Sequence, residues 1–355
     1  MRLQRRSVAL LGLAAITTTL VALPAAPAAA AQWPDFAEAF GINVSNTVVG
    51  EALTAGGTEH AVRWSPSGQI TDLGTLPGGQ FSGASGINGW GEIVGSSDTG
   101  ANANDAVRWS PTGQITVLPG LSVGPGSYSL ANAVNDAGVV VGFGIIADGD
   151  QHAVRWSPSG QITDLGGLPG YGDSIASAVN ESGVAVGYSE DGSAESAVRW
   201  DAHGRITELA RPAGDTTTFA DGINDFGEIV GAAFHQSDGQ WQAVEWDPAG
   251  NVHQLATGVQ TVEARAVNDL GVIVGEGQTP AVTADAAVWY PDGRSAVLPS
   301  LSSQSGGNPD FVSPNAINDR GVAVGRELQL NLSLAVRWSP DGRASALPTL
   351  LNPAG

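Results

Sequence analysis

A unit of 43 to 50 residues that recurs seven times constrains this chain more than any other feature of its sequence. One copy, Ser177–Ala210, contains four short strand patterns and two tight turns. The same tryptophan recurs in every copy, at Trp64, Trp109, Trp156, Trp200, Trp246, Trp289 and Trp338. The same asparagine recurs at Asn43, Asn88, Asn135, Asn180, Asn224, Asn268 and Asn318. Self-similarity of this length is typical of solenoids, propellers and arrays.

Each copy predicts four β-strands. Its apolar runs are short, rich in Val and Ile, and bounded by Gly and Pro, and none sustains a helical period. Four strands in about 45 residues make one propeller blade. We therefore predict an all-β protein, a seven-bladed β-propeller over residues 32–355. Its repeats start near residues 35, 80, 127, 172, 216, 260 and 310.

The two turns of each copy support hairpins. They read Asn-Asp-Xaa-Gly and Ser-Pro-Xaa-Gly in most copies. Asn or Ser can bond its own backbone two residues on, Pro presets φ, and Gly accepts the left-handed conformation. Gly204 is one such turn glycine. In the first copy Asn46 replaces the glycine of the first turn, and we expect it to adopt a positive φ.

The residue pattern also orders the four strands, named a to d along each copy. Strand a has Gly or Ala on one face just before the recurrent asparagine, so it suits the crowded axis. Strand b is apolar on both faces, and strand d alternates like an outer edge strand. With this phase the chain begins on a strand a and ends on a strand d, and no blade is shared at closure. A shift of one strand would instead make the two termini complete one blade together.

Residues 1–31 form a predicted secretory signal peptide. Arg2, Arg5 and Arg6 precede an apolar run and a small-residue stretch that ends near Ala31. The Arg5-Arg6 pair leaves twin-arginine export open beside the Sec route. We expect a secreted, extracellular protein with no stable membrane span after cleavage; a retained anchor is the alternative.

Charge and composition narrow the partners. Cleavage leaves 12 arginines, no lysine and 35 acids, a net charge near −23. Such a charge argues against nucleic acid and anionic membranes as partners. The chain has no cysteine, which excludes disulfides and thiol chemistry. We expect a monomer.

Binding residues are expected on one face of the ring. The a–b and c–d turns hardly vary, whereas the b–c and d–a loops of the opposite face, here called the variable face, differ in length. Functional residues tend to lie on loops held by a rigid scaffold. Their aromatic rings could stack on a sugar or a hydrophobic partner, or could wedge between blades. The candidate ligand-binding residues are Phe81, Tyr128, Tyr171, Tyr188, His235, Trp241 and Phe311.

An arginine recurs on strand c in five copies. The series is Arg63, Arg108, Arg155, Arg199 and Arg337. We interpret these arginines as half-buried side chains that pair with acids between blades, such as Asp136, Asp225 or Asp319. The alternative is a ring of cations that grips an anion.

No catalytic motif or cofactor site is predicted. No two histidines stand at a metal-ligand spacing, and His60 and His152 are read as residues of the repeat. Acids crowd the b–c loops, as in Asp148-Gly149-Asp150 and Glu190-Asp191, but match no EF-hand loop, so only weak calcium binding is left open. No nucleophile elbow, P-loop or dinucleotide fingerprint stands in a suitable context.

The repeat resembles that of the bacterial extracellular HAF family. The resemblance rests on Ala84–Gly95, on Ala61–Trp64 with the preceding His60, and on Gly68–Gly78, and it extends over all seven repeats. This chain has Val62 and Val154 where the family expects Phe. The resemblance implies export and a repeat fold, and it carries no catalytic residues to transfer.

Three functions remain open. The first is a secreted, non-catalytic propeller that binds a cell-surface glycan or an extracellular protein on the variable face. The second is an extracellular polysaccharide-acting enzyme, a glycosidase or lyase, with carboxylates on that face. The third is a purely structural exported protein. Acids and aromatic residues gathered in one central pocket would favour the enzyme, and their even spread would favour binding or structure.

Overall fold

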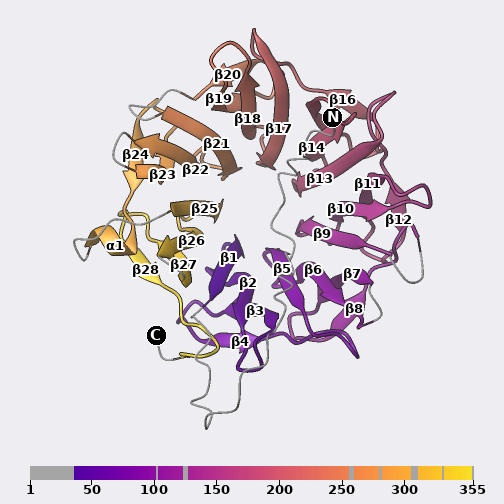
Figure 1. Cartoon of the computed structure of the whole chain (residues 1–355), viewed down its shortest axis with the longest axis vertical. Helices are drawn as coiled ribbons and strands as arrows, with labels where there is room; N and C mark the ends of the chain where they lie inside the picture. The colour runs from indigo at the N-terminus through magenta and orange to yellow at the C-terminus, as the bar shows by residue number, and fades with distance from the viewer. Residues whose placement is uncertain are drawn as a thin grey trace, which may run out of the picture. The chain divides into compact units, whose positions relative to one another are not determined.

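The compact unit Asp35–Gly355 contains seven four-stranded antiparallel sheets. The computed structural model describes residues 36–100, 103–122, 127–255, 260–279, 282–304, 311–329 and 332–353. Figure 1 shows the sheets arranged as a ring with the first strand of each nearest the centre. The predicted seven-bladed β-propeller is confirmed. The predicted signal peptide lies outside the described residues.

Each blade, numbered 1 to 7 along the chain, is one predicted repeat. Strands a are β1 (Ala37–Ile42), β5 (Ser82–Ile87), β9 (Ser129–Val134), β13 (Asp173–Val179), β17 (Asp215–Ile223), β21 (Gln260–Val267) and β25 (Phe311–Ile317). Strands b are β2 (Val48–Leu53), β6 (Ile93–Asp98), β10 (Val140–Ile145), β14 (Ala185–Glu190), β18 (Ile229–His235), β22 (Ile273–Thr279) and β26 (Ala323–Gln329).

Strands c and d form the outer half of each blade, and strand d, at the edge, is the shorter of the two. Strands c are β3 (Glu59–Trp64), β7 (Asn104–Trp109), β11 (Gln151–Trp156), β15 (Glu195–Trp200), β19 (Gln240–Trp246), β23 (Val282–Trp289) and β27 (Leu332–Trp338). Strands d are β4 (Ile70–Asp72), β8 (Ile115–Val117), β12 (Ile162–Asp164), β16 (Ile206–Glu208), β20 (Val252–Gln254), β24 (Ser295–Leu298) and β28 (Ala344–Ala346). Edge strands this short offer little template for pairing with another chain.

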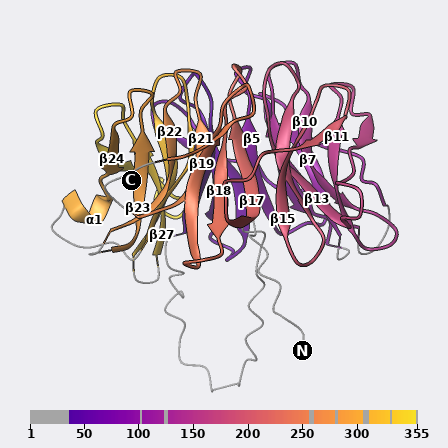
Figure 2. The same ribbon diagram turned by 90° about the horizontal axis from the view of Figure 1, so that it is seen from above.

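The strands of each blade run across the thickness of the ring, as Figure 2 shows from the side. Consecutive antiparallel strands place the a–b and c–d turns on one face and the b–c and d–a loops on the other. The one described helix, α1 (Leu301–Gln304), lies between blades 6 and 7 in the sequence. Among the described residues no helix is long and apolar enough to cross a membrane.

The ring closes without a shared blade, as the predicted strand phase requires. Blade 1 is built only from β1 to β4 and blade 7 only from β25 to β28. Across the junction Phe36 forms a parallel bridge with Ser333. The Trp64 Nε1 donates to the Pro348 carbonyl at 2.7 Å. Side-chain and backbone contacts therefore hold the closure.

The core consists of seven layers between neighbouring blades, each built around one repeat tryptophan. In the layer between blades 4 and 5, Trp246 packs with Val186, Leu209 and Ala220. In the layer at closure, Trp64 packs with Val324 and Leu347. Most of these tryptophans are fully buried, so each blade stabilises the next.

A bulge in strand a explains the recurrent glycine of strand b. In blade 4 the register shifts between Ala176 and Ala178, opposite Gly187. A Cβ at Gly187 would lie 2.0 Å from the Ile175 carbonyl oxygen, so only glycine fits there. The turn prediction is also confirmed, because Asn46 has a φ of 64°.

The recurrent asparagines form a closed ring of hydrogen bonds around the axis. Each Nδ2 donates to the backbone carbonyl of the corresponding asparagine in the next blade, and Asn318 donates to Asn43. The six other bonds join Asn43 to Asn88, Asn88 to Asn135, Asn135 to Asn180, Asn180 to Asn224, Asn224 to Asn268 and Asn268 to Asn318. The sequence predicted only the role of these residues within their own turns.

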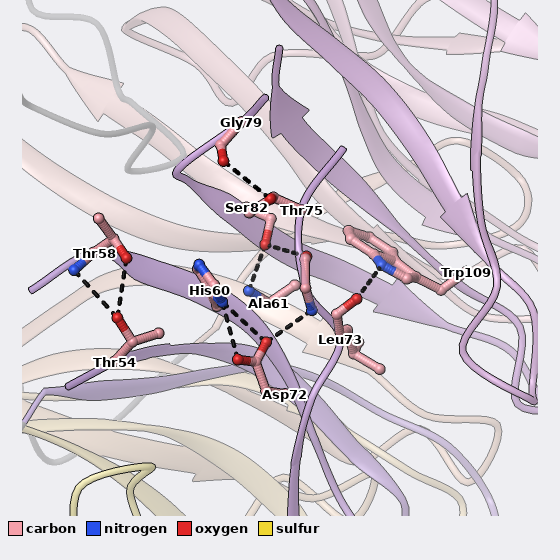
Figure 3. Close-up of polar contacts among 11 residues, drawn as sticks. Thr54, Thr58, His60, Ala61, Asp72, Leu73, Thr75, Gly79, Ser82 and Trp109 are labelled. Atoms are coloured by element: carbon pink, nitrogen blue, oxygen red, sulfur yellow. Dashed lines mark hydrogen bonds and ion pairs between the residues drawn. The ribbon is translucent and has the colours of Figure 1, made fainter. Parts of the chain in front are cut away.

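Further polar contacts join neighbouring blades, as Figure 3 shows for blades 1 and 2. The Ser82 hydroxyl accepts from the Ala61 N–H at 2.9 Å and donates to the Gly74 carbonyl at 2.8 Å. Trp109 donates its indole N–H to the Leu73 carbonyl. His60 lies 3.0 Å from Asp72 on the neighbouring strand of its own blade. His60 is thus a residue of the repeat, as predicted.

The expected acid partners of the strand-c arginines were wrong. Arg63 donates to the Pro111 carbonyl in the c–d turn of the next blade, not to an acid. Arg155 donates in the same way to Ala202 and also to Gly183. Arg108 combines such carbonyl bonds with an ion pair to Glu92. Because a tight turn directs its carbonyl oxygens outward, it offers an acceptor whatever its side chains are.

Candidate functional site

Four aromatic side chains meet where blades 4 and 5 join. The ring of Tyr188 on β14 packs edge-on against Phe219 on β17, with centroids 5.1 Å apart. Phe219 stacks on Trp241 of β19 at 5.3 Å, and Trp241 contacts Phe234 of β18 at 5.2 Å. Phe219 is buried, whereas the other three are half-buried. The group, here called the aromatic cluster, therefore offers part of its ring surface to solvent.

Two more predicted residues lie on the same two blades. The Tyr171 hydroxyl is 3.2 Å from the Ser196 hydroxyl at the start of β15. His235 bonds through Nδ1 to Asp215 at 2.6 Å, which orients its ring. Tyr188, His235 and Trp241 thus belong to blades 4 and 5, and Tyr171, in the loop before β13, contacts blade 4.

The other three candidates lie apart. Tyr128 stacks on Phe143 of blade 3 at 5.7 Å, and the Phe311 ring lies 5.3 Å from the guanidinium of Arg326 in blade 7. Phe81 precedes β5, and its backbone N–H bonds Asp98 in blade 2. The structure therefore does not bring all seven predicted residues into one site.

Acidic side chains surround the aromatic cluster. Burial, with a contribution from nearby Glu190, raises the pKa of the Tyr188 phenol well above its usual value. Burial and Glu190 also raise the pKa of Glu195. At neutral pH the Tyr188 hydroxyl stays protonated and can donate a hydrogen bond, and the carboxylates nearby can accept one.

The inner strands of blades 5 and 6 carry a second group, here called the inner acid cluster. The Arg265 guanidinium bonds Glu276 at 2.9 Å and Glu263 at 3.0 Å. The Ser313 hydroxyl donates to the same Glu276 oxygen at 2.7 Å. Burial, together with the adjacent Glu263 carboxylate, raises the pKa of Asp221 well above its usual value. An acid whose pKa is raised in this way favours its protonated form more than a free carboxyl does, and it is suited to proton transfer.

A similar arrangement lies at the closure. Arg326 pairs with Glu38 at 3.0 Å, and the Ser333 hydroxyl donates to the same carboxylate. Burial and the Glu38 charge raise the pKa of Glu51 well above its usual value. Over the part of the chain that the structure describes, no three His, Asp or Glu side chains are grouped so as to hold a metal ion.

Sequence reasoning missed Phe219 and the inner acids. It took Phe234 as a further candidate on a b–c loop but did not predict that Phe234 belongs to a cluster of rings. A signal was present for Asp221 and its neighbour Arg265, because the bulge position of strand a is Ser or Asn in blades 2, 3, 4 and 7 but charged in blades 5 and 6. A charge at a position next to the axis departs from the repeat and marks a place where neighbouring blades interact differently.

Comparisons with known proteins support the fold. No protein-family model matches the chain, and no curated protein matches it in sequence. Among solved structures, puromycin hydrolase is similar with a TM-score of 0.62 and 14% identity over 90% of this chain and 54% of that one. This chain thus spans about half the length of puromycin hydrolase.

Two further structures are similar over most of both chains. An oligogalacturonate lyase in complex with manganese has a TM-score of 0.55 and 12% identity, over 85% of this chain and 86% of that one. The β-propeller domain of the trilobed protease from Pyrococcus furiosus, which has an open velcro topology, has a TM-score of 0.54 and 9% identity, over 91% and 99%. At these identities the likeness concerns the propeller fold alone.

Proposed function

We propose that this protein is a secreted, non-catalytic propeller related to the HAF-repeat proteins, and that it binds a cell-surface glycan on the variable face of blades 4 and 5. The observation that carries the proposal is the aromatic cluster, with three half-buried rings beside carboxylates. Aromatic rings offer flat apolar surface to the C–H face of a sugar at little cost in conformational entropy. The carboxylates accept hydrogen bonds from sugar hydroxyls.

The test is binding of a panel of oligosaccharides and cell-wall fragments to the purified protein by calorimetry. Trp241→Ala is expected to weaken the bound member at least tenfold, about 1.4 kcal/mol, because it removes the central ring of the cluster. Tyr188→Phe keeps the ring and removes only the hydroxyl donor, so it tests the polar contact separately. The matched control is Trp90→Ala, because Trp90 is 74% exposed on an a–b turn.

Equal glycan affinities of the Trp241→Ala and Trp90→Ala variants would contradict a glycan site at the aromatic cluster. If no glycan binds and an extracellular protein is captured in a way that depends on Trp241, the partner is a protein and not a glycan, and the proposed binding face is retained.

A polysaccharide-acting enzyme is the second candidate, and the inner acid cluster favours it. Asp221 and Glu263 are neighbouring acids whose pKa values burial raises, beside the guanidinium of Arg265. The raised pKa values favour retention of a proton on one member of the pair, and a carboxylic acid that retains its proton can act as a general acid on a glycosidic oxygen. Release of reducing ends from a polysaccharide, lost in Glu263→Gln, would replace the binding proposal with this one.

A further inference from the structure

Four of the five strand-c arginines join neighbouring blades through a hydrogen bond to a turn of the next blade. In each case Nη1 donates to the carbonyl of the second residue in the following c–d turn. The pairs are Arg63 with Pro111 at 2.9 Å, Arg108 with Pro158 at 3.1 Å, Arg155 with Ala202 at 2.7 Å and Arg337 with Pro66 at 3.5 Å. The bond is a regular element of the ring.

Arg199 on β15 departs from this rule. The corresponding acceptor in blade 5 would be the Pro248 carbonyl, but within the described part of the chain the Arg199 guanidinium makes no hydrogen bond or ion pair. Its side chain is exposed, whereas the other four arginines of the series are half-buried. One permanently charged guanidinium, with all five N–H donors available, therefore faces the junction of blades 4 and 5.

A groove of about 460 Å³ lies at this place. Its walls include Arg199, Thr207 and Glu208 from blade 4, Arg211 from the following loop, and Gly250 from the c–d turn of blade 5. Thr207 pairs with Arg199 across strands β15 and β16, so both side chains lie on the same face of the blade. Grooves of 300 to 1,000 Å³ hold small ligands, and this one has room for a sugar unit.

Arg211 brings a second guanidinium to the groove. It pairs with Glu208 at 2.9 Å and donates to the Thr216 carbonyl at 3.0 Å and to the Ser196 hydroxyl. These bonds fix its orientation. Its Nε is buried and has no partner among the described residues. A buried donor without an acceptor costs free energy, and a ligand oxygen that reached it would recover that cost.

The charges of the groove contrast with those of the chain. Two arginines and one glutamate line it, in a protein with a formal net charge of −20. We propose that the groove between blades 4 and 5 binds an acidic saccharide through an oxyanion, carboxylate or sulfate, held by the guanidinium of Arg199. An arginine fork matches a planar oxyanion with two parallel hydrogen bonds. The saccharide part rests on the proposed function, while the anion site does not depend on the aromatic cluster.

The experiment measures binding of three probes to the full chain by calorimetry at low salt. They are trigalacturonate, a sulfated galactose oligosaccharide and neutral galactotriose. At least one anionic probe is expected to bind and neutral galactotriose to bind at least tenfold more weakly. The affinity should fall on addition of salt, because the arginine is exposed. Whether the carboxylate or the sulfate binds more tightly identifies the oxyanion.

Variants locate the site. Arg199→Gln is expected to weaken binding of the anionic probe at least tenfold. Arg199→Lys should recover only part of the affinity, since it restores the charge without the planar, forked donors of a guanidinium. Arg63→Gln is the matched control, because Arg63 belongs to the same series but bonds the next blade. Equal binding of charged and neutral probes, no binding of either anion, or an effect of Arg199→Gln no larger than that of Arg63→Gln would each overturn the proposal.

The same variants separate this site from the proposed function. Loss of anion binding in Arg199→Gln together with normal binding of the same probe in Trp241→Ala would place the acidic saccharide in the groove and not at the aromatic cluster. Normal binding of the glycan panel in Trp241→Ala would contradict the glycan site at the aromatic cluster alone. The reverse pattern would retain the aromatic cluster as the glycan site and exclude the groove.

Discussion

Replacing one asparagine of the axial ring tests whether these side chains stabilise the whole propeller or only their own turns. Asn180 is 5% exposed. Its Nδ2 donates to the Asn224 carbonyl at 3.2 Å, and its Oδ1 accepts from the Val184 N–H at 2.9 Å and from the Ser182 hydroxyl at 2.8 Å. Asn180→Ala removes all three bonds and leaves the Asn224 carbonyl without its side-chain donor.

The magnitude follows from the number of bonds. A hydrogen bond contributes a net of about 1 kcal/mol, so Asn180→Ala is expected to lower the free energy of unfolding by about 3 kcal/mol. The entropy of unfolding is about 2.1 cal/mol/K per residue, and the propeller, Asp35–Gly355, has roughly 320 residues. The Tm should therefore fall by about 4 °C.

The assay is urea unfolding followed by tryptophan fluorescence, with Asn251→Ala as the control. Asn251 is also a turn asparagine, but it is exposed, and its one partner among the described residues is Asp247 of its own turn. An exposed substitution of this kind should cost less than about 0.5 kcal/mol. Equal losses in the two variants would refute the idea that the ring contributes to the stability of the propeller.

Asn180→Asp tests the donor role of Nδ2 separately from the acceptor role of Oδ1. It keeps an oxygen for the Val184 N–H but turns a second oxygen toward the Asn224 carbonyl, which repels it unless the acid is protonated. The introduced acid would be buried, so its pKa in the folded state should be raised. The loss of stability should be larger at pH 7 than at pH 4, and a loss independent of pH would contradict the donor role of Nδ2.

Two further substitutions test the inner strands. Gly187→Ala is expected to destabilise the protein by several kcal/mol in urea unfolding, because its Cβ would lie 2.0 Å from the Ile175 carbonyl oxygen; a loss below about 1 kcal/mol would contradict the close approach. Asp221→Asn is expected to raise the free energy of unfolding relative to that of the unsubstituted protein, and to raise it more at pH 8 than at pH 5. The raised pKa of Asp221 means that the folded state keeps a proton that the unfolded state releases, so stability falls as pH rises from about 4 through the folded pKa. The same pH dependence in both proteins would contradict this assignment.

The asparagines at other bulges indicate which hydrogen bond an asparagine could make at position 221. Asn132 donates to the Ala176 carbonyl of the next blade, and Asn315 donates to the Ala39 carbonyl, both at 2.8 Å. An asparagine at position 221 has the corresponding carbonyl of Ala264 available in blade 6. Only a protonated Asp221 could donate in the same way.

The strands, their order and the closure could be predicted because they depend on residues repeated in every blade. Seven copies of one pattern average out local ambiguity, and the thin face of strand a placed it at the axis. The partners of the strand-c arginines could not be predicted in the same way. Their acceptors are backbone carbonyls of the next blade, which every residue carries and which leave no trace in the sequence.

The candidate site was predicted only in part, since its members depart from the repeat one at a time. Tyr188 and Trp241 are among the predicted ligand-binding residues, but Phe219 joins them only because blade 5 places its strand a beside strand b of blade 4. That neighbourhood depends on the rotation between blades. A pattern within one repeat describes the contacts of a residue with its own blade and says little about which unusual residues will meet across a junction.

The junction of blades 4 and 5 combines both kinds of departure from the repeat. Within the described residues it lacks the arginine-to-turn bond found at four other junctions, and it holds the aromatic cluster. The missing bond costs the ring little, because exposed charged contacts contribute at most about 1 kcal/mol and the buried layer around Trp246 remains intact. The exposed guanidinium of Arg199, in contrast, has no hydrogen-bond or ion-pair partner in the described part of the chain that would stabilise its position. A side chain that retains its charge and its position in the series while making no hydrogen bond or ion pair with any described residue is available for a ligand, and for this reason the junction of blades 4 and 5 is where a ligand should be sought first.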